Sequence, residues 1–439
     1  MKDFISKAKT RAQHVELYRV TAAETPVNFE NNRLKSIDTK EQRISALRLI
    51  KDGKLGFATT TGTDLDQLLE KALLTARFGR DWQAPLPGPA SLPSVELFHP
   101  STAAISSDKM VDMGQQVIEE LRQCHPEALA SAILNRREST VSLVNSSGFA
   151  GSYSRSIFSF MASVDLVEGK NMLCVYRDVG TGKLEDQVNQ AVKYLVDTFG
   201  KGRKNVSITS GAYPVVFTPQ AMGDILYPLL ACANGKAVEK GFSPWKDKLG
   251  QQLFNSRITL YDDPTIAYGP GSAVFDGEGM PAAVTNIIEK GVISNFLLDL
   301  DTAHSLGMKP TGNGYRGSAV DLPAPGNSNV VLEAEEPQPR QEIIEGIQKG
   351  VIVHSLMGAW AGNPFTGQVS GNIDLGFLVE KGEVVGRVKD CMMSINVFEA
   401  FKSRIEAVSQ EREWEPDYRG MSMLLPYILF DDVSISTKA

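Results

Sequence analysis

The sequence predicts an α+β protein in which N-terminal and central α/β blocks are followed by a large β-rich C-terminal domain. Runs with apolar residues at alternate positions, which are typical of strands, occur in every part of the chain. Amphipathic segments with helical spacing are concentrated in the first half of the sequence. Beyond about residue 235, strand and turn patterns dominate, and this asymmetry supports the α+β assignment.

The first block, residues 1–82, is predicted to be an N-terminal α+β domain. It opens with an amphipathic helix, and a strand follows at 15–20. Asn31-Asn32 and Asp52-Gly53 each separate alternating apolar runs, and Asp-Gly between such runs is a strong hairpin signal. A capped helix is expected to start near Asp64 and to continue to about residue 76.

Residues 83–100 are rich in proline and are predicted to form a semi-rigid linker to a central α+β domain at 101–205. In that domain we expect a helix that begins at Ser106, Ser107 or Asp108 and ends near residue 124. Strands are expected at 132–135, 140–145 and 151–167, with a turn at 145–148. A second helix is expected from 183 to 199, ending at Gly200.

The third block, residues 211–439, is predicted to be the β-rich C-terminal domain. A strand at 213–217 precedes a helix at 219–233. Two hairpins of similar layout are expected further on, where Lys290-Gly291 and Lys381-Gly382 interrupt hydrophobic runs.

Composition and charge exclude several classes of function. The chain has 439 residues, 42% hydrophobic and 22% charged, which suits a globular protein of two or three domains. No stretch approaches the roughly 20 apolar residues that cross a bilayer, and the first residues lack the apolar region of a secretory signal. We therefore expect a cytoplasmic protein with no membrane partner. The net charge is −7, and the densest basic run, 201–204, is short, so no nucleic-acid partner is expected.

Residues capable of catalysis are sparse. Five histidines are scattered, and none is spaced from another as in an H-E-x-x-H helix. Asp299, Asp301 and His304 lie close in sequence; a metal site is one interpretation, and a capped turn entering a short helix is the favoured one. His354, in an apolar run, is expected to be a core histidine. The four cysteines form no C-x-x-C pair, and Cys232 is expected to be a buried thiol, with a reactive one as the alternative.

No G-x-S-x-G motif is present either, so the sequence assigns no catalytic residue and no metal ligand. Two glycine-rich loops remain, at 311–317 and 358–372. Such loops allow a backbone to approach a ligand or peptide closely, although tight turns between strands would look the same. Asn313, Arg316 and Gln368 are the candidate substrate-binding residues, because their side chains can bond a peptide or its carboxylate.

These loops carry a resemblance to the TldD/PmbA family. Residues 309–316 are similar to that family's P-T-G-N-G-x-R segment, and 367–369 are similar to its later loop. Segments 28–34, 53–58 and 145–148 also match, in the same order along nearly the whole chain.

The resemblance implies a division of labour between two kinds of chain. A TldD-type chain resembles a zinc peptidase with an H-E-x-x-x-H helix, and it pairs with a TldE (PmbA) chain that lacks those ligands. Here the matching helix, about 224–235, contains neither His nor Glu, and 421–426 offers no counterpart to the TldD-type C-terminal cysteine. The chain therefore resembles the PmbA/TldE side.

This resemblance implies a subunit of a cytoplasmic metallopeptidase complex that acts on unstructured peptides. No cofactor is expected in this chain, and zinc is expected only in a TldD-like partner; the chain would form a dimer with that partner or with itself. Two alternatives stay open: a non-enzymatic regulatory protein linked to gyrase or to a toxin–antitoxin system, and a peptidase with an unrecognised site. The scattered histidines argue against the second, and the acidic charge argues against direct contact with DNA.

Overall fold

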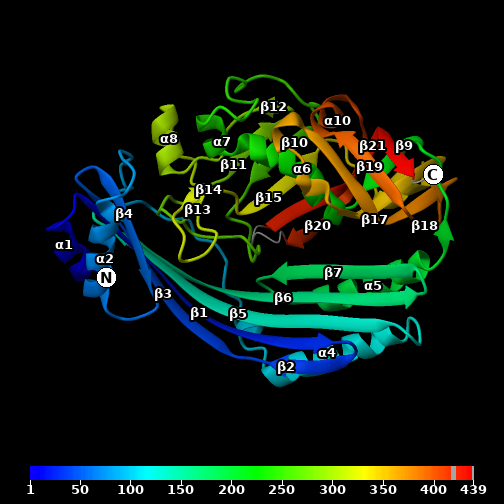
Figure 1. Ribbon diagram of the computed structural model, residues 1–439, viewed down its shortest axis with the longest axis horizontal. Coiled ribbons are helices and arrows are strands. Elements are labelled where there is room, and N and C mark those ends of the chain that lie inside the picture. Colours follow the sequence, from blue (N-terminus) through cyan, green and yellow to red (C-terminus); the bar gives the residue numbers. More distant parts are fainter. Residues whose placement is uncertain (417–421, 438–439) are drawn as a thin grey trace.

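The computed structural model describes residues 1–416 and 422–437 (Figure 1). A long, curved sheet from the N-terminal half lies beneath a C-terminal body of strands, loops and short helices. The α+β prediction, with its β-rich C-terminal part, is confirmed.

The first sheet is antiparallel throughout, and its strands run in the order β4-β3-β1-β5-β6-β7, with β2 paired to β1. Its strands are β1 (His14–Glu30), β2 (Arg33–Ile37), β3 (Lys40–Lys51), β4 (Lys54–Thr60), β5 (Leu129–Asn145), β6 (Ala150–Glu168) and β7 (Asn171–Thr181). Strand β1 pairs with β5 from Glu16↔Asn145 to Phe29↔Ala132. The first and central sequence blocks therefore share one sheet, a pairing that no local sequence pattern predicts.

The turns of this sheet lie where the sequence places them. Asn31, Asn32, Asp52 and Gly53 all have positive φ, the left-handed conformation that tight hairpin turns require. The strands expected at 132–135 and 140–145 are instead one continuous strand, β5, because its polar middle pairs with β1 and β6 on both sides.

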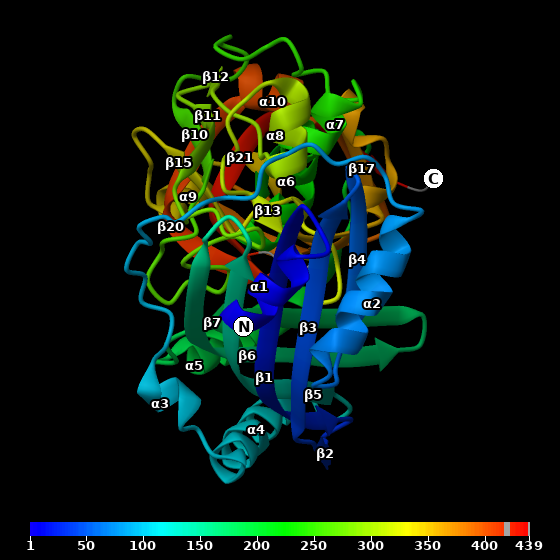
Figure 2. The same ribbon diagram turned by 90° about the vertical axis from the view of Figure 1, so that its left-hand side faces the viewer.

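Helices cover the sheet at both ends (Figure 2). They are α1 (Lys2–Lys9), α2 (Leu65–Ala76), α3 (Pro100–Ala103), α4 (Ser107–Arg122) and α5 (Gln187–Gly202). Asp64 and Ser106 cap α2 and α4 by accepting hydrogen bonds from backbone N–H groups. Helix α5 continues past Gly200, where an end was predicted, because Gly202 still packs tightly against the side chain of Leu173.

Twelve strands within the described residues form the C-terminal sheet. They are β8 (Asn205–Val206), β9 (Gly211–Phe217), β10 (Ile258–Asp262), β11 (Thr285–Glu289), β12 (Val292–Ile293), β15 (Asn329–Ala334), β16 (Lys349–Met357), β17 (Gln368–Glu380), β18 (Glu383–Val388), β19 (Cys391–Asn396), β20 (Ile405–Pro416) and β21 (Ser422–Thr437). Strands β9, β16, β17, β19 and β21 pair in a closed ring, which gives the sheet a barrel-like part. The predicted Lys-Gly hairpins are found as β11–β12 and β17–β18, with positive φ at both residues of each turn.

The main core of this domain surrounds the helix α6 (Pro219–Ala233), which has the predicted bounds. The other short elements are α7 (Gly235–Glu239), α8 (Leu300–Leu306), β13 (Gly314–Tyr315), β14 (Ala324–Pro325), α9 (Arg340–Glu345), η1 (Ala359–Ala361), η2 (Pro364–Thr366) and α10 (Val397–Ser403). No helix in the described part of the chain is both long enough and apolar enough to cross a bilayer.

Candidate functional site

A cavity of about 1170 Å³ lies between the first sheet and the C-terminal domain. Strands β5, β6 and β7 supply one wall, helix α6 supplies a second, and the loops around β14, η1 and η2 complete it. This volume is somewhat above the roughly 300–1,000 Å³ of most small-molecule pockets, which typically combine apolar walls with a few polar groups.

One face of α6 forms the second wall. Its lining residues recur every three or four positions, as expected for one side of a helix: Gln220, Gly223, Asp224, Tyr227, Leu230, Ala231 and, at the C-terminal cap, Asn234. The opposite side, which includes Ile225 and Leu229, is fully buried in the core. Residues 224–235, which were compared by sequence with the zinc-bearing helix of TldD-type chains, include much of the part of α6 that faces the cavity.

The cavity is acidic. Asp178, Asp224 and Glu415 line it, and its lining among the described residues includes no Lys, Arg or His. Glu415 forms a close ion pair with Arg177, whose other guanidinium nitrogen lies 2.7 Å from Glu413. Burial raises the pKa of Glu415 to about 7, with Arg177 opposing that rise. Burial also raises the pKa of Asp178, because water solvates its charge poorly at the cavity wall.

The donor atoms around the cavity do not fit a catalytic zinc. Such a site needs about three ligands from His, Cys, Asp or Glu in tetrahedral arrangement. The lining face of α6 offers only Asp224 of these types. Across residues 1–416 and 422–437, no group of three or more such side chains is placed to hold a metal ion. Zinc content itself stays a prediction, to be tested by metal analysis.

Asn313, the first candidate substrate-binding residue, is only 1% exposed. Its Nδ2 donates to Asp262 Oδ2 at 2.8 Å, and its Oδ1 accepts from Thr285 Oγ1 at 3.0 Å. Asp262 also accepts hydrogen bonds from the backbone and the hydroxyl of Ser328. The Asn313 side chain therefore fastens its glycine-rich loop to β10 and β11.

Arg316, the second candidate, has a side chain that is 2% exposed. It donates to Glu16 on β1 at 2.8 Å and to the carbonyl oxygens of Gly277 and Asp321, and its guanidinium lies 4.4 Å from the ring centre of Tyr18. Every guanidinium nitrogen is thus engaged within the protein, between the first sheet and the C-terminal domain.

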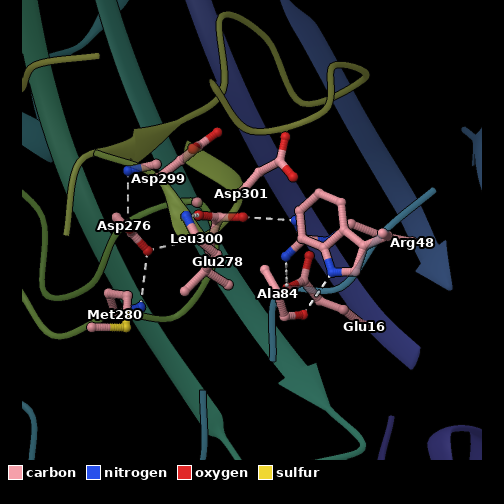
Figure 3. A network of polar contacts seen from close by, with 12 residues as sticks. Glu16, Arg48, Ala84, Asp276, Glu278, Met280, Asp299, Leu300 and Asp301 are labelled. Carbon is pink, nitrogen blue, oxygen red and sulfur yellow. Dashed lines mark hydrogen bonds and ion pairs between the residues drawn. The ribbon is translucent and has the colours of Figure 1, made fainter. Parts of the chain in front are cut away.

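Through Glu16, Arg316 is connected to a larger buried network that joins the two halves. Figure 3 shows the part of this network around Arg48, Glu278 and Asp276. Arg48 on β3 lies 2.7 Å from both Glu16 and Glu278, and Glu278 accepts the backbone N–H of Leu300 at 2.7 Å. Asp276 holds the turn that carries Glu278 by accepting the backbone N–H groups of Glu278 and Met280. Together with the Arg177 pairs, this network fixes the two walls of the cavity relative to each other.

Gln368, the third candidate, is exposed at the start of β17, and its Nε2 donates to Ser394 Oγ at 2.7 Å. The residues of the later glycine-rich loop that line the cavity are Trp360, Pro364 and Phe365. The structure therefore brings part of that loop to the cavity, but it does not bring the three candidate residues together.

The remaining sequence candidates have structural roles. Asp299 caps α8 by accepting from the backbone N–H of Thr302 at 2.8 Å, as the capped-turn interpretation predicted, and Asp301 pairs with Arg80 at 2.8 Å. The half-buried His354 ring bonds the hydroxyl of Tyr194 at 2.7 Å, and desolvation lowers its pKa to about 3. Burial raises the pKa of Cys232 to about 12, as expected for an inert thiol. Met421, which begins the segment compared with the TldD-type C-terminus, lies outside the described residues.

Comparison with known families decides the classification. Residues 210–437, more than half of the chain, match the PmbA/TldA metallopeptidase C-terminal domain, and residues 15–76 match domain 1 of the same family. The chain belongs to the PmbA/TldA metallopeptidase family. The matched C-terminal domain contains α6 and most of the cavity wall opposite the first sheet.

Relatives with family names lie at moderate distance. A metalloprotease from Methanothermobacter thermautotrophicus is 26% identical over 407 residues, covering 90% of this chain and 87% of that protein. A metalloprotease TldD homolog from Haemophilus influenzae is 28% identical over 185 residues, or 42% of this chain and 38% of that protein.

Solved structures share the whole PmbA/TldA fold. TldE from Thermococcus kodakarensis has a TM-score of 0.92 at 24% identity, covering 99% of both chains. A putative modulator of a DNA gyrase from Thermotoga maritima has a TM-score of 0.88 at 21% identity, covering 99% of this chain and 100% of that one.

The sequence did not indicate the polar residues of the cavity wall, among them Asp178, Gln220 and Asn327. For α6 a signal was available, because Gln220, Asp224 and Tyr227 form a polar stripe on an otherwise apolar helix. For Asp178 and Asn327 no local pattern separates a cavity residue from an ordinary strand end or loop.

Proposed function

We propose that this chain is the PmbA/TldE-like subunit of a cytoplasmic metallopeptidase complex. In this proposal it lacks zinc ligands of its own and contributes part of the cavity that holds an unstructured peptide. The observation that carries the proposal is the position of α6. The helix that matches the zinc-bearing segment of TldD-type chains faces a peptide-sized cavity, yet its lining face carries neither His nor Glu.

The zinc would come from a TldD-like sister chain, with which this protein would form a dimer. Relatives named as metalloproteases support the reaction class. The cavity supports a peptide as the ligand. Its apolar residues can contact apolar peptide side chains, and its amide side chains can bond polar groups of the peptide. Of the three residues suggested by the sequence, Gln368 alone has an exposed side chain, so we assign a peptide contact to it, just after the cavity residues Pro364 and Phe365 in the sequence.

The test is reconstitution. This chain and a TldD-like sister encoded in the same genome are purified separately, and unstructured peptides are incubated with each chain and with the mixture. We expect cleavage in the mixture and its loss with a chelator, and light scattering of the mixture should show a dimer. Cleavage by this chain alone, abolished by the chelator, would overturn the proposal.

A cavity-filling variant links the activity to this site. Ala231→Trp should lower cleavage by the mixture without separating the two chains, because the indole occupies space that the peptide needs. Ala90→Trp, in the exposed proline-rich segment, is the matched control and should leave cleavage unchanged. Equal activity of the two variants would show that the peptide binds elsewhere.

A further inference from the structure

Two buried side-chain atoms at the cavity wall have no hydrogen-bond partner among the described residues. They are Nδ2 of Asn327 and Oε1 of Gln220. Asn327 is only 8% exposed, so bulk water does not easily satisfy its amide. Nearly all buried polar groups in proteins are paired. Both atoms are covered in the structure, but their residues line the cavity, so a small side-chain rotation would turn each atom toward a ligand. One atom is a donor and the other an acceptor, as needed to bond the C=O and N–H groups of a peptide backbone.

These two atoms lie near opposite ends of α6. Gln220 is in the first turn of the helix, and Asn327 follows β14. Strand β14 is tied to the other end of the helix, because Asn234 Nδ2 donates to the carbonyl oxygen of Pro325 at 2.9 Å. The 15 residues of α6 span about 22 Å at about 1.5 Å per residue. An extended peptide covers that length with about six or seven residues at about 3.3 Å each.

Charge defines the side chain that such a peptide would place in the cavity. Arg177 is the charge that opposes the raised pKa of Asp178, but its guanidinium is already paired with Glu413 and Glu415. The described lining holds three carboxylates and no cationic residue, and Arg177 behind it is already bound by two carboxylates, so an acidic peptide side chain would meet net like charge there. Leu230, Trp360 and Phe365 offer apolar contact to neighbouring side chains.

We propose that the cavity binds an extended segment of about six residues that carries a Lys or Arg side chain at Asp178, with its backbone bonded by Gln220 and Asn327. This inference rests on the proposed function, because it names the class of peptide that the same cavity would bind. It predicts that the complex favours basic, apolar segments and rejects acidic ones.

The test is calorimetric titration of the purified full chain, without a sister chain or zinc, with three capped hexapeptides. The peptides are identical alanine- and leucine-based sequences with lysine, norleucine or glutamate at one central position. We expect the lysine peptide to bind about tenfold more tightly than the norleucine peptide, and the glutamate peptide more weakly than both.

Variants assign each contact. Asp178→Asn should make the lysine and norleucine peptides bind equally, while Asp112→Asn, on the exposed face of α4, should keep the lysine preference. Asn327→Ala should weaken the lysine and norleucine peptides alike, by roughly three- to tenfold for one lost hydrogen bond. Gln220→Ala, at a partly exposed position, tests the same backbone contact should Asn327→Ala fail to fold.

Three results would overturn the inference: no binding of any peptide, equal binding of the lysine and glutamate peptides, or a lysine preference that survives Asp178→Asn. Because this assay measures binding by one chain, its result is independent of whether the mixed complex cleaves peptides. Cleavage without the lysine preference would retain the proposed function and reject only the peptide class.

Discussion

Replacing Arg48 with methionine should weaken the junction between the two halves of the protein. The Arg48 side chain is 2% exposed and lies 2.7 Å from both Glu16 and Glu278, which are 0% and 1% exposed. Methionine keeps an apolar stem of similar length against Trp82, whose ring centre is 5.0 Å from the guanidinium. The substitution therefore removes mainly the charge, and it leaves Glu278 buried without its cation.

The size of the effect follows from that burial. Removing one partner of a buried ion pair destabilises a fold by about 3–5 kcal/mol. Unfolding entropy is about 2.1 cal/mol/K per residue, or about 0.9 kcal/mol/K for 439 residues unfolding together. The melting temperature should therefore fall by about 3–5 °C. Arg33→Met, at an exposed position of β2, should change it by less than about 1 °C.

The loss should also depend on pH. Burial raises the pKa of Glu278 to about 8, although Arg48 opposes that rise. At pH 6 the folded protein therefore holds a proton on Glu278 that the unfolded chain has released, and Arg48 then stabilises mainly Glu16. At pH 9 Glu278 is ionised and depends on Arg48, so the variant should lose more stability at pH 9 than at pH 6.

The assay is differential scanning calorimetry of both variants and the wild type at pH 6 and pH 9. The double variant Arg48→Met with Glu278→Gln should recover part of the loss, because it also removes the uncompensated carboxylate. A shift below about 1 °C at both pH values, or a larger loss at pH 6, would refute this account of the network.

The same structure makes four further predictions. Metal analysis of the purified chain should find no stoichiometric zinc, since the cavity donors do not fit one; about one tightly held zinc per chain would contradict this. Asn327→Ala should leave the melting temperature unchanged or raise it, because the Nδ2 of Asn327 has no partner among the described residues. Asn313→Ala should lower the melting temperature by about 1–3 °C, because Asp262 then loses a hydrogen-bond donor. The free energy of unfolding should fall as pH drops below about 6.5, because His354 becomes protonated in the unfolded chain while burial keeps its pKa in the folded protein at about 3. In thermal melts between pH 6.5 and 4, the melting temperature of His354→Gln should fall less than that of the wild type. Cys232 should react with a thiol reagent at pH 8 only as fast as the protein unfolds, since burial raises its pKa to about 12; rapid labelling of the native protein at Cys232 would show that it is accessible.

Local structure was predictable from local chemistry. The bounds of α6, the caps of α2 and α4, and the Asp52-Gly53 and Lys381-Gly382 hairpins all follow from signals within a few residues. The pairing of β1 with β5 was not predictable, because alternation shows that a segment is a strand and does not identify its neighbour.

The site was harder to predict for a similar reason. Asn313 and Arg316 sit in a family motif, and glycine around polar side chains suggests ligand contact. Glycine also lets a loop fold inward, and here the same side chains bond Asp262 and Glu16 inside the protein. The cavity residues Asp178 and Asn327 come from segments about 150 positions apart in the sequence, and only the tertiary fold brings them to one cavity.

The insertion of β1 between β3 and β5 has a consequence during translation. Residues 1–82 can form the β1–β3 pairing as soon as they leave the ribosome, but β5 is not complete until residue 145. At about 5–20 residues per second, the outer edge of β1 waits roughly 3–13 s for its partner. During this time the unpaired edge of β1 can pair with a neighbouring nascent chain. Expression of residues 1–82 alone should therefore give aggregates, whereas a fragment extending through α5 contains every strand of the first sheet.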